Sequence, residues 1–118
     1  MRAGTREGVE PVCPFCRSRL DRPTMMRISS VEEVLGGTCA QCGALYVVDP
    51  TSKNVGEAMM QALGMAAVKL SKETSEMVAG QDYDDAILSY DWRTHRSPGP
   101  PRGFMDGHGR LYIIKIKR

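Results

Sequence analysis

Four cysteines in two closely spaced pairs are the feature of this 118-residue chain that most restricts its fold. Cys13 and Cys16 form one Cys-x2-Cys pair, and Cys39 and Cys42 form a second pair after a spacer of 22 residues. Two thiolates of one tight turn can reach the same metal ion at about 2.3 Å, and two such turns supply four soft ligands, which suits tetrahedral zinc. The spacing therefore predicts one structural Zn²⁺ per chain, bound by all four cysteines.

The residues around these pairs carry a family resemblance. Pro14 lies within the first pair, Gly43 follows the second pair, and an apolar, β-rich segment occupies 44–48. Residues 9–50 resemble the zinc-ribbon group of folds, in which each cysteine pair lies at a hairpin tip, the knuckle, and the metal ion joins two knuckles. Zinc ribbons occur in transcription factors, ribosomal proteins, polymerase subunits and topoisomerases. The resemblance thus implies a metal site and a local fold, and it leaves the function open.

The expected architecture is α+β: a small β zinc ribbon followed by helices and a C-terminal strand. Residues 1–8 are small and charged and predict a flexible N-terminus. Residues 9–50 form the ribbon, which has too small a core to fold without metal. Residues 51–118 form a helical extension with the closing strand, packed with the ribbon as one unit.

The first helix is expected at 54–70, with Asn54 as the N-cap and Glu57 three positions later. Apolar residues cover more than half of its circumference, whereas a one-sided surface helix needs only one apolar stripe. The helix should therefore be buried on two sides, against the ribbon and against a second helix or another subunit. A homodimer is the favoured arrangement, and the candidate interface residues are Met59, Met60, Leu63 and Ala67.

A second helix is expected at 81–92, because apolar residues recur there at helical spacing. Three aspartates would lie in its first turn, where carboxylates favour the positive end of the helix dipole. A hard-cation site is the alternative, although the spacing and glycine of an EF-hand are missing. The apolar face consists of Tyr83, Ala86, Ile87 and Tyr90, and the aspartates are Asp82, Asp84 and Asp85.

Strands are expected at 44–49 and at 111–118, the second with alternating apolar residues and preceded by turn dipeptides at 106–109. Lys115 and Lys117 would protect a sheet edge from aggregation. The spacer at 30–35 has two interpretations: a helical turn with Ser30 and Glu33 as a capping box, or an extended segment leading to the second cysteine pair.

Basic residues are concentrated at the C-terminal end, where residues 92–118 hold seven basic side chains and one acidic one. Residues 51–91 have the opposite balance, with three basic and seven acidic side chains. Either the two regions neutralise each other within the fold, or the basic end contacts a polyanion such as nucleic acid. The candidate polyanion-binding residues are Arg17, Arg19, Arg22, Arg27, Arg110, Lys115 and Lys117.

Nothing in the sequence forms a catalytic constellation, so we expect a protein that is not an enzyme. Its two histidines, His95 and His108, lie in turn-like segments and are alternatives as accessory metal ligands. Four thiolates leave no open coordination position for catalysis. Thiol redox chemistry is a remote alternative, because Cys-x2-Cys in redox proteins normally opens a helix.

We expect a cytoplasmic protein without a membrane span, because no run of 18 apolar residues occurs and residues 1–8 lack the apolar core of a signal peptide. The leading functional hypothesis is a non-catalytic interaction or assembly module. The alternative is a nucleic-acid-binding or transcription-associated protein, whose basic regions contain few aromatic residues for stacking on bases.

Overall fold

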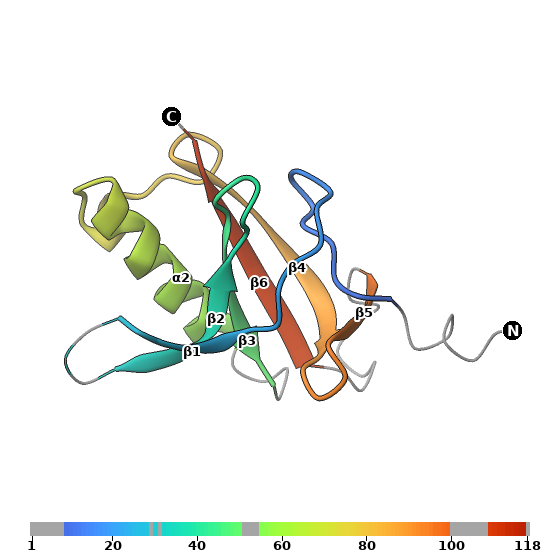
Figure 1. The fold of residues 1–118 in the computed structure, drawn as a ribbon. Coiled ribbons are helices and arrows are strands. Elements are labelled where there is room, and N and C mark those ends of the chain that lie inside the picture. Colours follow the sequence, from blue (N-terminus) through green and yellow to red (C-terminus); the bar gives the residue numbers. More distant parts are fainter. Residues whose placement is uncertain (1–8, 29, 31, 51–54, 100–108, 118) are drawn as a thin grey trace, which may run out of the picture.

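The computed structural model of the protein describes residues 9–28, 30, 32–50, 55–99 and 109–117. Its strands form one six-stranded antiparallel sheet in the order β1-β2-β3-β6-β4-β5 (Figure 1). Because β6 lies between β3 and β4, the sheet joins the cysteine-containing part of the chain to the C-terminal part. The strands are β1 (Thr24–Arg27), β2 (Glu33–Thr38), β3 (Leu45–Asp49), β4 (Tyr83–Asp91), β5 (Arg96–Gly99) and β6 (Gly109–Ile116).

Each face of the sheet carries its own hydrophobic core, because successive side chains of a strand point to opposite faces. In β6, Tyr112 and Ile114 lie on one face, whereas Leu111 and Ile113 lie on the other. The helix-side core contains Val34, Leu45, Val47, Ala58, Ala62, Leu63, Ala66, Tyr83, Tyr112 and Ile114. The cysteine-side core contains Cys13, Leu20, Cys39, Ala44, Tyr46, Val48, Tyr90, Leu111 and Ile113.

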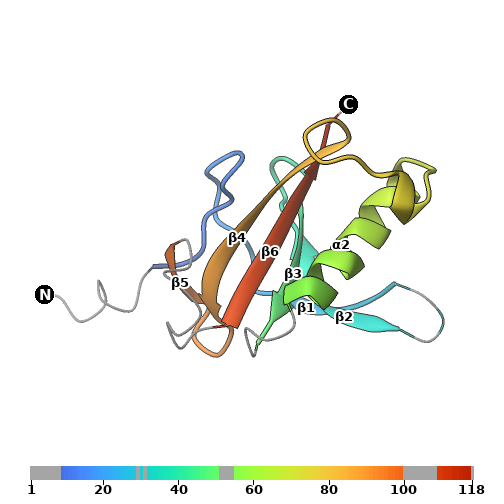
Figure 2. The same ribbon diagram turned by 180° about the vertical axis from the view of Figure 1, so that it is seen from behind.

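Helix α2 (Val55–Lys69) covers the first of these faces and packs on β3 and β6 (Figure 2). Ala58, Ala62 and Ala66 form the buried stripe of the helix, and their small side chains allow its backbone to approach the sheet closely. The helix expected at 54–70 is confirmed, whereas its expected cap, Asn54, lies outside the described residues. Among the described residues, no helix has the length and apolar character that a membrane crossing requires.

The second expected helix is wrong, because residues 83–91 form strand β4. β4 pairs with β6 through eight residue pairs, from Tyr83 with Ile116 to Tyr90 with Gly109. Tyr83 and Tyr90 would share one face of a helix, but their odd separation places them on opposite faces of a strand. Each tyrosine is therefore buried in a different core. Pairing with β6 and burial on both faces outweigh the helical spacing of this short segment.

The expected fold class is corrected accordingly. In the described part of the chain after β3, the elements are one α-helix, a one-turn 3-10 helix η1 (Thr74–Glu76) and three strands, so a series of helices does not follow a ribbon. The C-terminal strand is also central in the sheet, and Lys115 and Lys117 therefore protect no edge. Of the two interpretations of the spacer, the extended one holds for residues 33–35, which belong to β2, since Glu33 pairs with Arg27 of β1. Most of the expected turn at 106–109 lies outside the described residues.

Candidate metal centre

All four cysteines converge on one point above the cysteine-side core. Their Sγ atoms lie within 4.8 Å of one another. Two of the separations join different pairs: 3.6 Å between Cys13 and Cys42, and 3.5 Å between Cys16 and Cys39. The four cysteines are free thiols rather than disulfides. This arrangement can hold a metal ion, and the expectation that the two pairs share one site is confirmed.

The first knuckle is a tight turn over residues 13–18. The Arg17 N–H donates to the Cys13 carbonyl at 2.8 Å, and the Cys13 N–H donates to the Ser18 carbonyl at 2.8 Å. Arg17 adopts a left-handed backbone with φ of 69°, which lets the chain turn back immediately after Cys16. The two thiols of the pair are thereby held on the same side of the turn.

The second knuckle is the hairpin tip between β2 and β3 and repeats this geometry. The Gly43 N–H donates to the Cys39 carbonyl at 2.9 Å, and the Cys39 N–H donates to the Ala44 carbonyl at 2.7 Å. Gly43 adopts a φ of 81°, a conformation that glycine reaches without steric cost. Figures 1 and 2 both place the two knuckles at the same end of the sheet.

Contacts with the β4–β5 turn hold the first knuckle in place independently of the thiols. His95 Nε2 lies 2.8 Å from the Leu20 carbonyl oxygen, and His95 Nδ1 lies 2.6 Å from the Tyr90 hydroxyl. Arg22 donates to the Trp92 carbonyl at 3.1 Å. Both ring nitrogens of His95 are therefore engaged away from the cysteines. The alternative of His95 as an accessory ligand finds no support, and His108 lies outside the described residues.

Burial separates the four thiols into two kinds. Cys13 and Cys39 are 0% and 2% exposed, whereas Cys16 and Cys42 are half-buried. Burial raises the pKa of the Cys13 thiol to about 12 and also raises the pKa of Cys42. Hydrogen bonds from Ser18 lower the pKa of Cys16 to about 6. A cation that binds here must displace protons from the buried thiols, so acid competes with the metal.

Most of the candidate polyanion-binding residues have partners within the protein. Arg110 is buried and donates to the Ser89 hydroxyl at 3.4 Å. The remaining residues are distributed over the first knuckle, strand β1 and the end of β6. Their contacts are Arg19 with Glu10, Arg22 with Trp92, Arg27 with Glu33, Lys115 with the Cys42 carbonyl, and Lys117 with Asp84 and the Gly80 carbonyl, while Arg17 is exposed on the first knuckle.

The three aspartates also have separate partners. Asp82 accepts from Lys72 Nζ at 2.8 Å and from the Val78 N–H at 2.8 Å. Asp85 accepts from the Tyr112 hydroxyl at 2.6 Å, and Asp84 lies 3.7 Å from Lys117 Nζ. In the part of the chain that the structure describes, the cysteines are the one cluster suited to a metal ion. The aspartates are thus structural, although in a strand and the turn before it rather than in a helix.

The candidate interface residues of α2 divide into two groups. Leu63 and Ala67 are buried, and Leu63 belongs to the helix-side core. Met59 and Met60 are 37% and 56% exposed. The interface itself stays a prediction, and these two methionines are the members of the set that present free surface.

Sequence reasoning missed the hydrogen bonds that connect Tyr90 through His95 to Leu20. Leu20 lies 75 positions before His95 in the sequence. A tyrosine and a histidine five positions apart carry no signal for a contact with a distant carbonyl. Comparisons with protein-family models, with curated proteins and with solved structures found no match. The functional conclusion therefore rests on the fold and the site.

Proposed function

We propose that this protein is a non-catalytic zinc protein in which one structural Zn²⁺, bound by Cys13, Cys16, Cys39 and Cys42, fastens the first knuckle to the sheet. The single observation that carries the proposal is the convergence of four Sγ atoms within 4.8 Å. The rest of the surface then serves as an interaction module.

Zinc suits this site because of the donor set and its size. A tetrahedral ion with Zn–S bonds of about 2.3 Å separates its sulfur ligands by about 3.8 Å. The cross-knuckle separations of 3.6 Å and 3.5 Å are close to that value. Four thiolates are soft ligands that favour zinc over magnesium or calcium. When bound, the ion supplies positive charge that stabilises the buried thiolates and ties the two knuckles together.

The geometry favours a structural role over a catalytic one. Four cysteine ligands complete a tetrahedral shell and leave no position for water or substrate. Cys13 and Cys42 are 29 positions apart, so a metal ion that joins them closes a long loop of the chain. Metal binding therefore contributes directly to the free energy of folding.

An interaction role is supported by exposed apolar residues on α2. Met60 is 56% exposed and Val68 is 77% exposed, on a helix whose opposite face is buried. Large apolar side chains grouped on one surface are typical of contact sites. Methionine adapts its shape to different partners.

Nucleic-acid binding is the second candidate, and one observation favours it. The Arg22 guanidinium lies against the backbone of Trp92, whose side chain is 43% exposed. An exposed aromatic side chain, which can stack on a base, thus belongs to a residue whose backbone is bonded to a cation that can contact a phosphate. Nearby Glu10, Asp21 and Asp91 reduce the positive charge of this surface, so we rank it second.

The test of the zinc proposal is metal analysis of the protein purified under reducing conditions. We expect one zinc per chain and, after exchange, the intense visible spectrum of tetrahedral thiolate-bound Co²⁺. Cys16→Ser should lose the metal. His95→Ala is the matched control and should retain it, because both His95 ring nitrogens bond elsewhere. A folded, reduced protein without metal would overturn the proposal, as would a pair of disulfides between the knuckles.

A further inference from the structure

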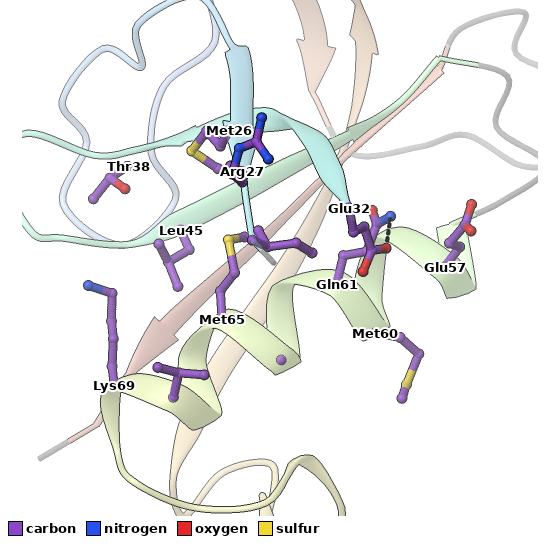
Figure 3. A pocket seen from close by; sticks show the side chains of 13 residues that line it. Met26, Arg27, Glu32, Thr38, Leu45, Glu57, Met60, Gln61, Met65 and Lys69 are labelled. Carbon is purple, nitrogen blue, oxygen red and sulfur yellow. Dashed lines mark hydrogen bonds between the residues drawn. The ribbon is translucent and has the colours of Figure 1, made fainter. Parts of the chain in front are cut away.

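A methionine-lined groove runs beside α2 over the face of β1 and β2. Its volume is about 660 Å³. Met65 of the helix faces Met26 and Leu45 of the strands across it, whereas Met60 points away from the strands (Figure 3). Helix α2 packs mainly on β3 and β6, so among the described elements it leaves part of β1 and β2 uncovered. The groove is thus an apolar surface within the fold that has room for an additional chain segment.

A second cavity, of about 700 Å³, lies beside the second knuckle. Three lysines line it: Lys69 from the end of α2, and Lys115 and Lys117 from the end of the chain. Asp84 is the acidic residue of its lining and lies near Lys117. Three lysines face one carboxylate in this lining, and Cys42 of the candidate metal centre lies beside them. The lining is therefore basic at the lysines, and the negative charge of the thiolates reduces that excess when zinc is bound.

The two cavities meet, because Thr38 and Lys69 line both of them. Across the described residues, no hydrogen bond or ion pair engages the Lys69 side chain, so its charge is available at the junction. The opposite end of the groove holds two carboxylates: Glu57 at the start of α2, and Glu32, which accepts from Gln61 Nε2 at 3.2 Å (Figure 3). Arg27 of β1 also lines the groove. The surface therefore has two carboxylates at one end, methionines along its length and three lysines at the other end.

We propose that this continuous surface binds a segment of a partner protein in which a cluster of apolar residues adjoins a cluster of acidic ones. The apolar side chains enter the groove between Met26 and Met65, and the acidic side chains meet Lys69, Lys115 and Lys117. Charge complementarity decides which end of the segment lies at the lysines, since its acidic side chains are repelled from Glu32 and Glu57. This inference rests on the proposed interaction role and specifies the chemistry of the partner.

A peptide segment fits this surface better than a small amphiphile does. Both cavities are open along one side rather than enclosed, whereas a small-ligand site buries most of its ligand. Flexible methionines can adjust to branched apolar side chains of a bound segment. In peptide recognition, buried apolar anchors usually supply most of the binding energy, and charged contacts beside them add specificity.

The test is selection from a phage-displayed library of random linear peptides on the zinc-loaded protein, followed by fluorescence anisotropy with a selected peptide. We expect enriched sequences in which acidic residues adjoin an apolar cluster. Gly64→Leu should weaken binding by at least about tenfold, because it places a side chain in the groove. A Cβ at Gly64 meets nothing within 4 Å, and leucine favours a helix, so this variant stays folded.

Gly56→Leu is the matched control, because Gly56 is also in α2 with open space at its Cβ but does not line the groove. For the basic end, Lys69→Glu should weaken binding, whereas Arg93→Glu, with the same change of charge in the β4–β5 turn, should not. Zinc content of every sample is measured alongside. If the selected peptides bind Gly64→Leu as tightly as the parent protein, the groove is not their binding site. The proposed interaction role would still hold.

Three other outcomes also decide the matter. Enrichment of basic instead of acidic residues contradicts the charge argument. Failure to enrich any peptide on zinc-loaded protein contradicts the segment proposal, while the zinc proposal stands on its own metal analysis. Competition by decanoate or dodecyl phosphate as strong as that of the selected peptide shows a small-amphiphile site instead.

Discussion

Arg17 and Gly43 occupy equivalent positions in the two knuckles, one residue after the second cysteine of each pair, and both have left-handed backbones, with φ of 69° and 81°. The turn that presents two thiols to one metal ion requires this conformation in both cases. Glycine adopts it without cost, whereas a residue with a Cβ pays about 1–2 kcal/mol. The first knuckle therefore carries strain that its other contacts must offset.

We expect Gly43→Ala to lower the free energy of unfolding by about 1 kcal/mol, the left-handed penalty less the reduced entropy of the unfolded chain. A Cβ at Gly43 meets nothing within 4 Å, so the effect is purely one of backbone conformation. Gly64→Ala is the control, with equally open space but helical φ, and should raise stability by roughly 0.5–1 kcal/mol. Urea unfolding of the zinc-loaded proteins measures both. Equal effects of the two substitutions would contradict the strain argument.

Removal of His95 should destabilise the protein without releasing the metal. His95→Ala leaves the hydroxyl of Tyr90, a fully buried side chain, without its partner, which costs about 1–3 kcal/mol. In a Tyr90→Phe background the same substitution should cost less, because no hydroxyl is left unpaired. Denaturant unfolding of the four proteins of this double-mutant cycle gives the coupling. A coupling of zero would show that the hydrogen bond contributes nothing.

Chelation of the metal should loosen the knuckles before the centre of the sheet. Structural zinc contributes roughly 10–16 kcal/mol in small modules, and the knuckles at 13–18 and 39–44 depend on it most directly. The helix-side core, around Tyr112 and Ile114, has no cysteine in it. Hydrogen exchange after treatment with a chelator should therefore accelerate first at the knuckle amides. Simultaneous and equal acceleration in β6 would instead indicate that the metal holds the whole sheet.

The contribution of Asp82 to stability should depend on pH. The hydrogen bond from Lys72, together with that from the Val78 N–H, holds the pKa of Asp82 below its ordinary value. The folded state thus favours the carboxylate, and this stabilisation is complete above the unfolded pKa of about 3.9. It is lost as pH falls through the lower pKa of the folded state.

Asp82→Asn should therefore be less stable than the parent protein at neutral pH, and the difference should shrink in acid. Denaturant unfolding of both proteins from neutral to acidic pH measures this difference in the free energy of unfolding. Zinc release in acid affects both proteins alike and therefore cancels from the difference. Lys72→Met should show the same pH trend, because it removes the principal cause of the shift. A difference independent of pH would contradict the assigned role.

Binding to duplex DNA should be weak at physiological salt, with a shallow dependence on salt concentration. Arg110 is buried, and Arg19, Arg27 and Lys117 already lie beside carboxylates, so few cations are free to displace counterions from phosphates. Electrophoretic mobility at several salt concentrations gives the slope. A slope that corresponds to about six or more released ions would place the nucleic-acid function first.

Local sequence determined the candidate metal site and the first helix. The reach of two thiols in a Cys-x2-Cys turn depends only on the backbone between them, so Cys13, Cys16, Cys39 and Cys42 could be assigned without a structure. The helix at α2 is long enough for its apolar pattern to be unambiguous. Strands β3 and β6 could also be predicted from the sequence, because their apolar, β-branched residues are typical of strands buried on both faces.

Tertiary structure alone decided the remainder. Residues 83–91 suit a helix by spacing, but β6 supplies a partner for their backbone, and the two faces of the sheet bury Tyr83 and Tyr90 separately. The groove beside α2 likewise exists because the helix packs mainly on β3 and β6 and leaves part of β1 and β2 uncovered. Such features depend on contacts between segments that are distant in the sequence. The free energy of these contacts outweighs local conformational preference, and the local sequence pattern does not indicate which segments will meet.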